Sequence, residues 1–345
     1  MTSTPARTLT TGLAAALAAT ALWGFTFLGP AAVAPVNVYA LVVGRYTVFG
    51  MVSLTVLLVH RRRLRALGTR QVLAALHLGI VGYIGFYLLL SLSSKSAGSV
   101  LAATLTGLIP LLVAVVSNAM EKVLPWRRLV LPITLTSAGL LLVNSGGAPG
   151  RTATGHGLAA GVLLGFLASA AWSYFVVVNH RLLRRSPRPV GNSLWTACIG
   201  LGAFAGSLLL VPVARSVRGV SPFSGTATLV PFLLWCVAIA ILGSWCATWF
   251  WNIASRRLPA TVMGPVIAME AVFGAAFNLL WQHRSPTSHE LWGGLLVVAG
   301  VLLGSALFHR AGPGRPQPDR PAARRPDALT TRQGTGGPRR DPRQP

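Results

Sequence analysis

Ten apolar stretches dominate the chain, and each is about as long as the hydrocarbon core of a bilayer is thick. An α-helix rises about 1.5 Å per residue, so about 20 residues cross a core of about 30 Å. Lipid offers the backbone no hydrogen-bond partners, so stretches of this kind must be helical. The sequence therefore predicts an all-α membrane protein with ten transmembrane helices. The predicted spans are residues 12–29, 36–59, 71–92, 97–119, 126–144, 157–179, 192–213, 228–251, 259–281 and 290–308.

Composition supports a membrane protein and excludes several other classes. Hydrophobic residues make up 53% of the chain and charged residues 10%, with a mean hydropathy of +0.62. The net charge of +24 would suggest nucleic acid in a soluble protein, but the positive residues lie in loops and in the C-terminal segment, so no nucleic-acid partner is expected. Cys198, Cys236 and Cys246 fall inside predicted spans without metal-ligand spacing. We therefore expect no metal, no cofactor and no disulfide framework.

The loop charges predict the orientation of the chain. Arginine and lysine accumulate in cytoplasmic loops, and here the loops after the second, fourth, sixth and eighth spans hold fourteen such residues against five in the opposite set. This bias places both termini in the cytoplasm of a multi-pass plasma-membrane protein. The five residues of the opposite set are Lys95, Arg151, Arg215, Arg218 and Arg284.

The two ends of the chain need separate interpretations. Arg7 precedes an apolar run, as in a secretory signal, but the run continues through Trp23 and Phe27 without a polar cleavage region. Residues 1–11 are therefore predicted to be a short cytoplasmic N-terminus before a first transmembrane helix. Residues 309–345 contain eight prolines, many arginines and almost no apolar residues, which predicts a disordered basic cytoplasmic tail.

The chain also repeats itself. Five spans in residues 12–144 are followed by an external linker, 145–156, and five more spans in residues 157–308. Trp23 and Trp172 occupy similar motifs at the start of the two halves, and Gly139 and Gly300 do so near their ends. An odd number of helices in each half forces the two halves to cross the membrane in opposite directions. Two inverted five-helix repeats are typical of secondary transporters, whose solute site lies at the repeat interface near the midplane.

Motifs at several points of both halves together carry a resemblance to a known family. They are Ala21-Leu-Trp-Gly-Phe25, Arg45, Pro110, Met120-Glu121, Ser137-Ala-Gly139, Trp172, Arg257-Leu-Pro-Ala260-Thr-Val, Met269-Glu270 with Val272-Phe273, and Ala299-Gly300-Val301. The chain resembles ten-helix members of the drug/metabolite transporter superfamily, built from two EamA-like domains. The resemblance implies a substrate among amino acids, other metabolites or drugs. The sequence departs from the family pattern at Ala271, where proline is usual, and at Gln282-His283-Arg284, which replaces the usual Gly-Glu.

Two ionisable side chains are predicted near the middle of the membrane, where such groups are costly and therefore suggest function. Arg45 lies about 14 Å and Glu270 about 16 Å into their helices, at the helical rise per residue. Arg45 could bind a carboxylate or phosphate while Glu270 binds an ammonium group or carries a coupling proton. Alternatively, the two form a structural ion pair, or backbone carbonyls and hydroxyls cap each one separately.

Aromatic residues and one lysine complete the candidate site. Trp23, Phe25, Trp172 and Tyr174 belong to the repeated motif of the first and sixth spans, and their rings could line a solute cavity or simply pack between helices. Lys95, in a turn outside the membrane, could attract anions at a periplasmic mouth or snorkel to lipid headgroups.

The sequence thus predicts a secondary transporter that exports a small organic solute by alternating access. Its expected partners are that solute, membrane lipids, protons as coupling ions and a second copy in a homodimer. No catalytic residue is predicted, because no HExxH, GxSxG or GxxxxGKS motif is present. The alternatives are an intramembrane lipid-modifying enzyme and a membrane sensor that transports nothing.

Overall fold

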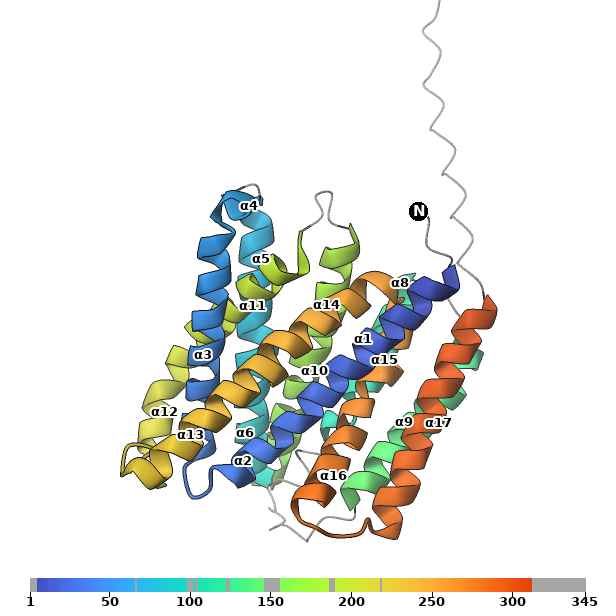
Figure 1. Cartoon of the computed structure of the whole chain (residues 1–345). Coiled ribbons are helices and arrows are strands. Elements are labelled where there is room, and N and C mark those ends of the chain that lie inside the picture. Colours follow the sequence, from blue (N-terminus) through green and yellow to red (C-terminus); the bar gives the residue numbers. More distant parts are fainter. Residues whose placement is uncertain are drawn as a thin grey trace, which may run out of the picture. The chain divides into compact units, whose positions relative to one another are not determined.

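The structure, a computed structural model, describes residues 5–65, 67–97, 102, 105–121, 125–145, 156–185, 190–217 and 219–311. Helices form almost all of these residues (Figure 1). Within these residues the β-structure is limited to an isolated bridge between Val36 and Val220. The helices of the first half are α1 (Pro5–Phe25), η1 (Thr26–Leu28), α2 (Gly29–Ala32), α3 (Val38–Val59), α4 (Arg61–Arg65), α5 (Thr69–Gly79), η2 (Ile80–Gly85), α6 (Phe86–Ala97), α8 (Ile109–Glu121) and α9 (Trp126–Ser145). Those of the second half are α10 (His156–Arg185), α11 (Asn192–Ser207), η3 (Leu208–Leu210), α12 (Val211–Ser216), α13 (Thr226–Ala238), η4 (Ile239–Cys246), α14 (Ala247–Arg257), α15 (Ala260–Ile267), α16 (Met269–Trp281) and α17 (Ser288–Ala311).

The described helices fall within or across the predicted spans, and the count of ten stays a prediction. Seven are long and apolar enough to cross a membrane, and α8 and α17 contain shorter apolar stretches. The first helix begins at Pro5, before the start predicted for the first span. The predicted linker falls almost wholly, and the predicted basic tail mostly, outside the described residues.

Three spans are interrupted in their middle. The third and eighth spans each contain a π-helix, η2 and η4, which widens the helix locally. The ninth span breaks at Ala268, between α15 and α16, where the Ala268 N–H donates 3.1 Å to the Pro265 carbonyl in a tight turn. The missing proline at Ala271 therefore does not prevent a break in this span, because one helix ends at Ile267 and the next begins at Met269.

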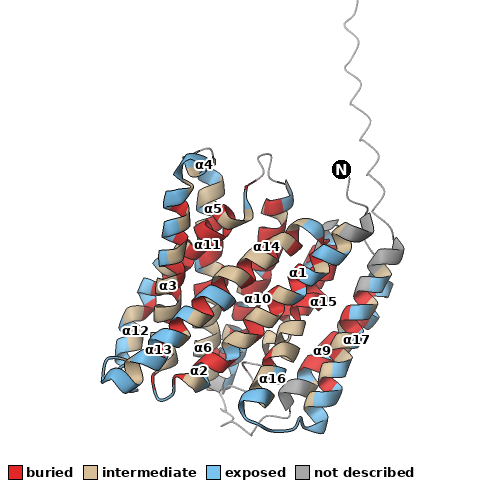
Figure 2. Cartoon of the chain, in the orientation of Figure 1, coloured by how far each residue is buried: buried red, intermediate tan, exposed pale blue. Residues whose placement is uncertain are grey.

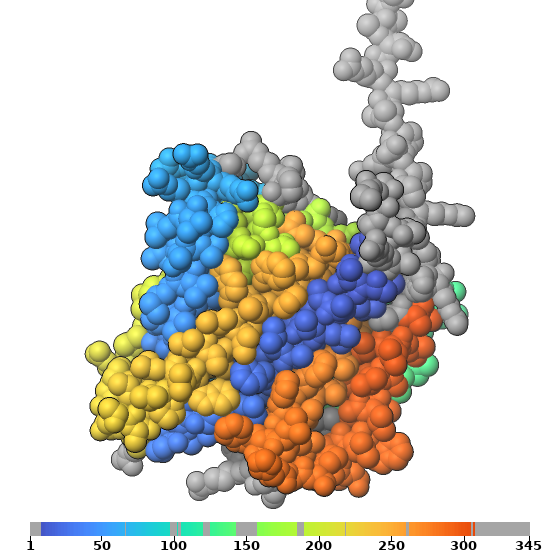
Figure 3. Space-filling view, in the orientation of Figure 1, coloured from blue at the N-terminus to red at the C-terminus, as the bar shows by residue number. Residues whose placement is uncertain are grey.

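Helices of the two halves pack against their counterparts. The second span (α3) packs on the seventh (α11), the fourth (α8) on the ninth (α15), and the fifth (α9) on the tenth (α17). The first span (α1) lies along α14 and α16, and Figure 3 shows it between them on one face of the bundle. The sixth span (α10) similarly lies along α6 and α8. The first and sixth spans thus each pack against the opposite half. In both cases the contacts are with the third and fourth spans of that half.

Two glycines allow α9 and α17 to approach each other closely. A Cβ atom at Gly139 of α9 would lie 2.6 Å from the backbone oxygen of Gly293 and 2.7 Å from the nitrogen of Val297 in α17. A Cβ at Gly300 of α17 would lie 2.9 Å from backbone atoms of Pro132 and Thr136 in α9. These contacts are reciprocal, and small residues at such crossings let two membrane helices approach closely. The repeated Ala-Gly motif therefore has a packing role.

Burial is concentrated inside the bundle, while apolar side chains also cover its outside. Figure 2 shows buried residues along α10, α11, α14 and α15. Large apolar side chains such as those of Leu58, Leu209 and Leu302 are more than 60% exposed. An apolar exterior of this kind suits a surface that faces lipid rather than water.

Candidate functional site

Arg45 is held in the middle of the bundle by the π-helix η4. Its Nε donates a hydrogen bond of 2.7 Å to the Ser244 hydroxyl, and its Nη2 donates one of 3.1 Å to the backbone carbonyl of Gly243. The guanidinium also lies 5.2 Å from the centre of the Tyr46 ring, which favours a cation. Side-chain and backbone oxygens therefore cap Arg45, which is the third of the interpretations that the sequence left open.

Glu270 occupies the first turn of α16, directly after the break at Ala268. The N-terminus of a helix carries a partial positive charge, so the break gives this carboxylate a favourable electrostatic position. Helix α1 crosses at this point, because a Cβ at Gly24 would lie 2.9 Å from the backbone oxygen of Glu270 and 2.7 Å from the nitrogen of Gly274. The Trp-Gly-Phe motif thus supplies the glycine that brings α1 onto the turn holding Glu270.

The two charged groups are near neighbours but are not in direct contact. Arg45 is close enough to influence the charge of Glu270, yet no ion pair within 4.0 Å joins these two described residues. Both residues are partly exposed rather than buried. Tyr83 lies within electrostatic range of both, and Tyr87 within range of Arg45. The site therefore combines a cation, an acid and phenol hydroxyls from helices of both halves.

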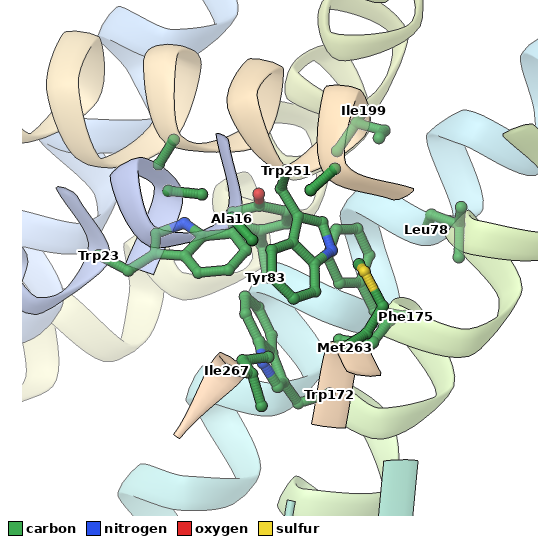
Figure 4. Close-up of a cluster of buried hydrophobic side chains, with 14 of the residues drawn as sticks. Ala16, Trp23, Leu78, Tyr83, Trp172, Phe175, Ile199, Trp251, Met263 and Ile267 are labelled. Carbon is green, nitrogen blue, oxygen red and sulfur yellow. The ribbon is translucent and has the colours of Figure 1, made fainter. Parts of the chain in front are cut away.

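Trp23 and Trp172 meet on one side of this site. Their ring centres are 5.3 Å apart in an edge-on arrangement, and Trp251 lies 5.1 Å from Trp23 (Figure 4). Tyr83 contacts Trp172 at 5.7 Å and is hydrogen-bonded to Thr248. Both tryptophans are more than 90% buried, so in this conformation their rings pack against other aromatic rings. Whether they also contact solute stays a prediction.

The other three predicted site residues lie farther from the centre. Phe25 stacks on Trp235 with ring centres 5.6 Å apart. Tyr174 is 42% exposed on the outside of the bundle, where its hydroxyl lies 3.2 Å from the His77 Nε2. Lys95 is exposed, with its ammonium 4.8 Å from the centre of the Tyr39 ring. The prediction for Tyr174 as a pocket residue therefore receives no support from its position.

Sequence reasoning missed Ser244, Tyr46, Tyr83 and Tyr87, which surround the two charges. Serine and tyrosine are frequent in membrane helices, so residue type alone does not select these four. One available signal was the spacing of Tyr83 and Ser244 along the chain, which equals the spacing of the glycines at 139 and 300. Equivalent places in the two halves were thus marked by polar side chains.

The family is decided by a sequence model that describes EamA-like transporters and matches this chain twice, over residues 10–145 and 159–306. The chain belongs to the EamA-like transporter family. These matches cover most of the bundle and correspond closely to the two halves described above. The chain is therefore a multi-pass membrane protein of the transporter class, and the enzyme alternative is not supported.

Several relatives of this EamA-like protein carry names that indicate transport or a membrane location. It is 29% identical to the inner membrane protein YtfF of Escherichia coli K12, over 85% of this chain and 94% of the relative. It is 27% identical to a biotin transporter of Salmonella typhimurium, over 84% and 90% of the two chains. A third relative, of the same species, is named "Probable amino-acid metabolite efflux pump" and is 24% identical over 51% and 57%.

A solved crystal structure shares the fold of the EamA-like protein. The TM-score is 0.69 at 20% sequence identity, and the match covers 88% of this chain and 99% of the other. At this identity the likeness supports the architecture alone.

Proposed function

We propose that the protein is a secondary transporter that exports a small organic solute across the plasma membrane by alternating access. The observation that carries the proposal is the arrangement of Arg45 and Glu270. They come from opposite halves and lie within electrostatic range, partly exposed and without a direct ion pair. Two charges left apart at the centre of a membrane protein are costly unless they serve a ligand.

We assign Arg45 to an anionic group of the solute. The hydrogen bonds to Ser244 and Gly243 fix the guanidinium through its Nε and Nη2, and they leave its Nη1 for a ligand. A fixed guanidinium loses little conformational entropy when it binds a carboxylate. The names of the relatives agree with such solutes, since biotin and amino acids both carry a carboxylate. Trp23 and Trp172 supply an aromatic wall beside this group.

We assign Glu270 to a solute ammonium group or to a coupled proton. Among the described residues it is the acidic side chain in the middle of a span, and it lies within electrostatic range of Arg45. A carboxyl group there can gain or lose a proton as the site opens to one side or the other.

An inverted repeat with both termini in the cytoplasm explains the two family matches and the paired helix contacts. Gly82 in η2 and Gly243 in η4 have the same separation along the chain as Gly139 and Gly300. The arginine-rich end, where α4 and the C-terminal ends of α10 and α14 lie, is then the cytoplasmic end (Figure 1).

Three measurements test this function. Untargeted metabolite profiling of cells with and without the gene identifies a solute, and flux in reconstituted vesicles then measures its transport. Arg45→Ala is expected to abolish flux while the folded protein still reaches the membrane, and Arg45→Lys is expected to restore it only in part. Glu270→Gln is expected to remove the pH dependence of flux, and full flux with an unchanged pH profile would disprove the proton role.

A further inference from the structure

Two rows of polar side chains run from the site toward opposite ends of the bundle. The α14 row lies on η4 and α14, and the α6 row on η2 and α6, with four-residue spacing that keeps each row on one face of its helix. The α14 row is Ser244, Thr248, Asn252 and Arg256, and the α6 row is Tyr83, Tyr87, Ser91 and Lys95. Each residue of the α6 row is separated from the corresponding residue of the α14 row by the same number of residues that separates Gly139 from Gly300. Both rows end in a cationic side chain.

In the α14 row, each side chain bonds to at least one other helix. Thr248 is hydrogen-bonded to Tyr83 of η2. The Asn252 side chain accepts a hydrogen bond of 3.0 Å from Asn179 of α10 and donates one of 2.9 Å to Thr196 of α11. Apart from Tyr83, these side chains are fully buried, with no exposed surface. The path from the site toward the arginine-rich end is therefore closed here.

The outermost member of the α14 row seals the same end. Arg256 donates 2.8 Å from its Nε to the Asn192 side chain and 2.5 Å from its Nη2 to the carbonyl of Val190. Trp195, in the first turn of α11, donates 2.8 Å to Asn179 and extends the network of the row. From Thr248 to Arg256 the row thus joins α14 to η2, α10, α11 and the loop before α11 over about 12 Å, the length of about eight helical residues.

Beyond Tyr83, which is buried and bonded to Thr248, the α6 row is different in both burial and bonding. Tyr87 and Ser91 are hydrogen-bonded to each other on one helix, and both are partly exposed. Lys95 is exposed and contacts the ring of Tyr39. Equivalent positions in the two halves therefore bridge helices at one end and remain accessible at the other.

We propose that the two rows line the solute path and form its two gates, with the α14 row shut and the α6 row open in this structure. This inference rests on the proposed transport function and adds which residues open and close. When the protein changes state, the α14 row separates and the α6 row forms cross-helix bonds in turn.

Unpaired buried polar groups beside the α14 row reduce the stability of the closed gate relative to the open one. The indole nitrogens of Trp23 and Trp251 and the Ser255 hydroxyl have no hydrogen-bond partner within the described residues. Leaving such groups unpaired is unfavourable, and water admitted by opening would hydrate them. The bonds lost on opening are therefore partly compensated, which allows two states of similar free energy.

A reversible cross-link tests the shut gate. Asn179→Cys and Asn252→Cys are introduced after the three native cysteines have been replaced by alanine. Oxidation of this pair is expected to stop flux, and reduction is expected to restore it. The two single-cysteine proteins treated with the same oxidant are the controls. Flux that continues at the same rate after complete cross-linking would overturn the proposal.

Thiol labelling tests both gates. A membrane-impermeant maleimide is applied from each side to Ser91→Cys and to Ser255→Cys in the same cysteine-free background. We expect Ser91→Cys to react from the end opposite to the arginines and Ser255→Cys to be protected. Added Thr248→Val should raise the labelling rate of Ser255→Cys about fivefold, the shift expected from one lost hydrogen bond.

Thr20→Val is the matched control for Thr248→Val. Its hydroxyl is equally buried but bonds within its own helix, to the carbonyls of Ala16 and Leu17. If both valine variants changed the labelling equally, the α14 row would be ordinary packing and the proposal would be wrong. A cysteine-free protein that folds and shows no flux of any solute would instead contradict the proposed function, whatever the labelling shows.

Discussion

The hydrogen bond from Arg45 to Ser244 allows a test of whether the solute binds only a guanidinium that is held in place. Ser244→Ala removes the 2.7 Å acceptor and leaves the Arg45 Nε without this partner. A hydrogen bond to a charged group contributes about 1.5–3 kcal/mol, and we take the lower end because Arg45 is partly exposed. This loss corresponds to about a tenfold increase in KM if the solute binds only the fixed guanidinium.

Thermal unfolding and solute flux measure the two consequences of Ser244→Ala. In detergent, the purified variant should unfold at a temperature a few degrees lower than the parent, since about 1.5 kcal/mol shifts the midpoint of a large domain by a few degrees. In vesicles, KM should rise while the maximal rate changes less. Ser53→Ala is the matched control, because the Ser53 hydroxyl is fully buried and has no hydrogen-bond partner among the described residues. Equal unfolding temperatures and equal KM values for the two variants would refute the reasoning.

Three further predictions concern the helix crossings and the loop before α17. Gly24→Val should lower stability by about 1–3 kcal/mol, measured by thermal unfolding, because a Cβ there would lie 2.7 Å from the nitrogen of Gly274. His283→Gly should raise stability by about 1 kcal/mol in the same assay, because His283 follows α16 with a φ of 50°, which favours glycine. Glu290→Gln should lower stability by about 1 kcal/mol or less, because the Glu290 carboxylate accepts hydrogen bonds of 2.8 and 2.5 Å from Arg284 and this ion pair is partly exposed. An unfolding temperature of Glu290→Gln equal to or above that of the parent would contradict a stabilising role for this ion pair.

The sequence singled out the two charges but not their partners. Arg45 and Glu270 were placed at one level by counting residues from the helix ends, and the structure brings them within electrostatic range. Counting could not identify Ser244 as the group that caps Arg45, because the contact joins helices 199 residues apart. The π-helix that presents Ser244 also has no sequence signature comparable to an N-cap or a C-terminal glycine.

The aromatic motif shows the same limit on a single helix. Trp172 and Tyr174 are separated by one residue, and at about 3.6 residues per turn they point to nearly opposite sides. Trp172 accordingly packs in the interior, while Tyr174 lies beside His77 on the outside. To tell which of the two residues faces the site, one must know which side of the helix faces the bundle interior. The sequence does not reveal this side, because the helix is hydrophobic all round.

The π-helix η4 has a consequence for changes in chain length. Each residue of a helix advances the side chains by about 100°, at about 3.6 residues per turn, so one deleted residue rotates everything beyond it by that angle. A deletion within Ile239–Cys246 would rotate Asn252 and Arg256 away from their hydrogen-bond partners. Arg45 lies on α3 and would not move with them. The widened turn therefore determines the rotation of the end of α14 about the helix axis relative to the solute site. Homologues with a shortened turn at this point are expected to carry different polar residues in the rest of the helix.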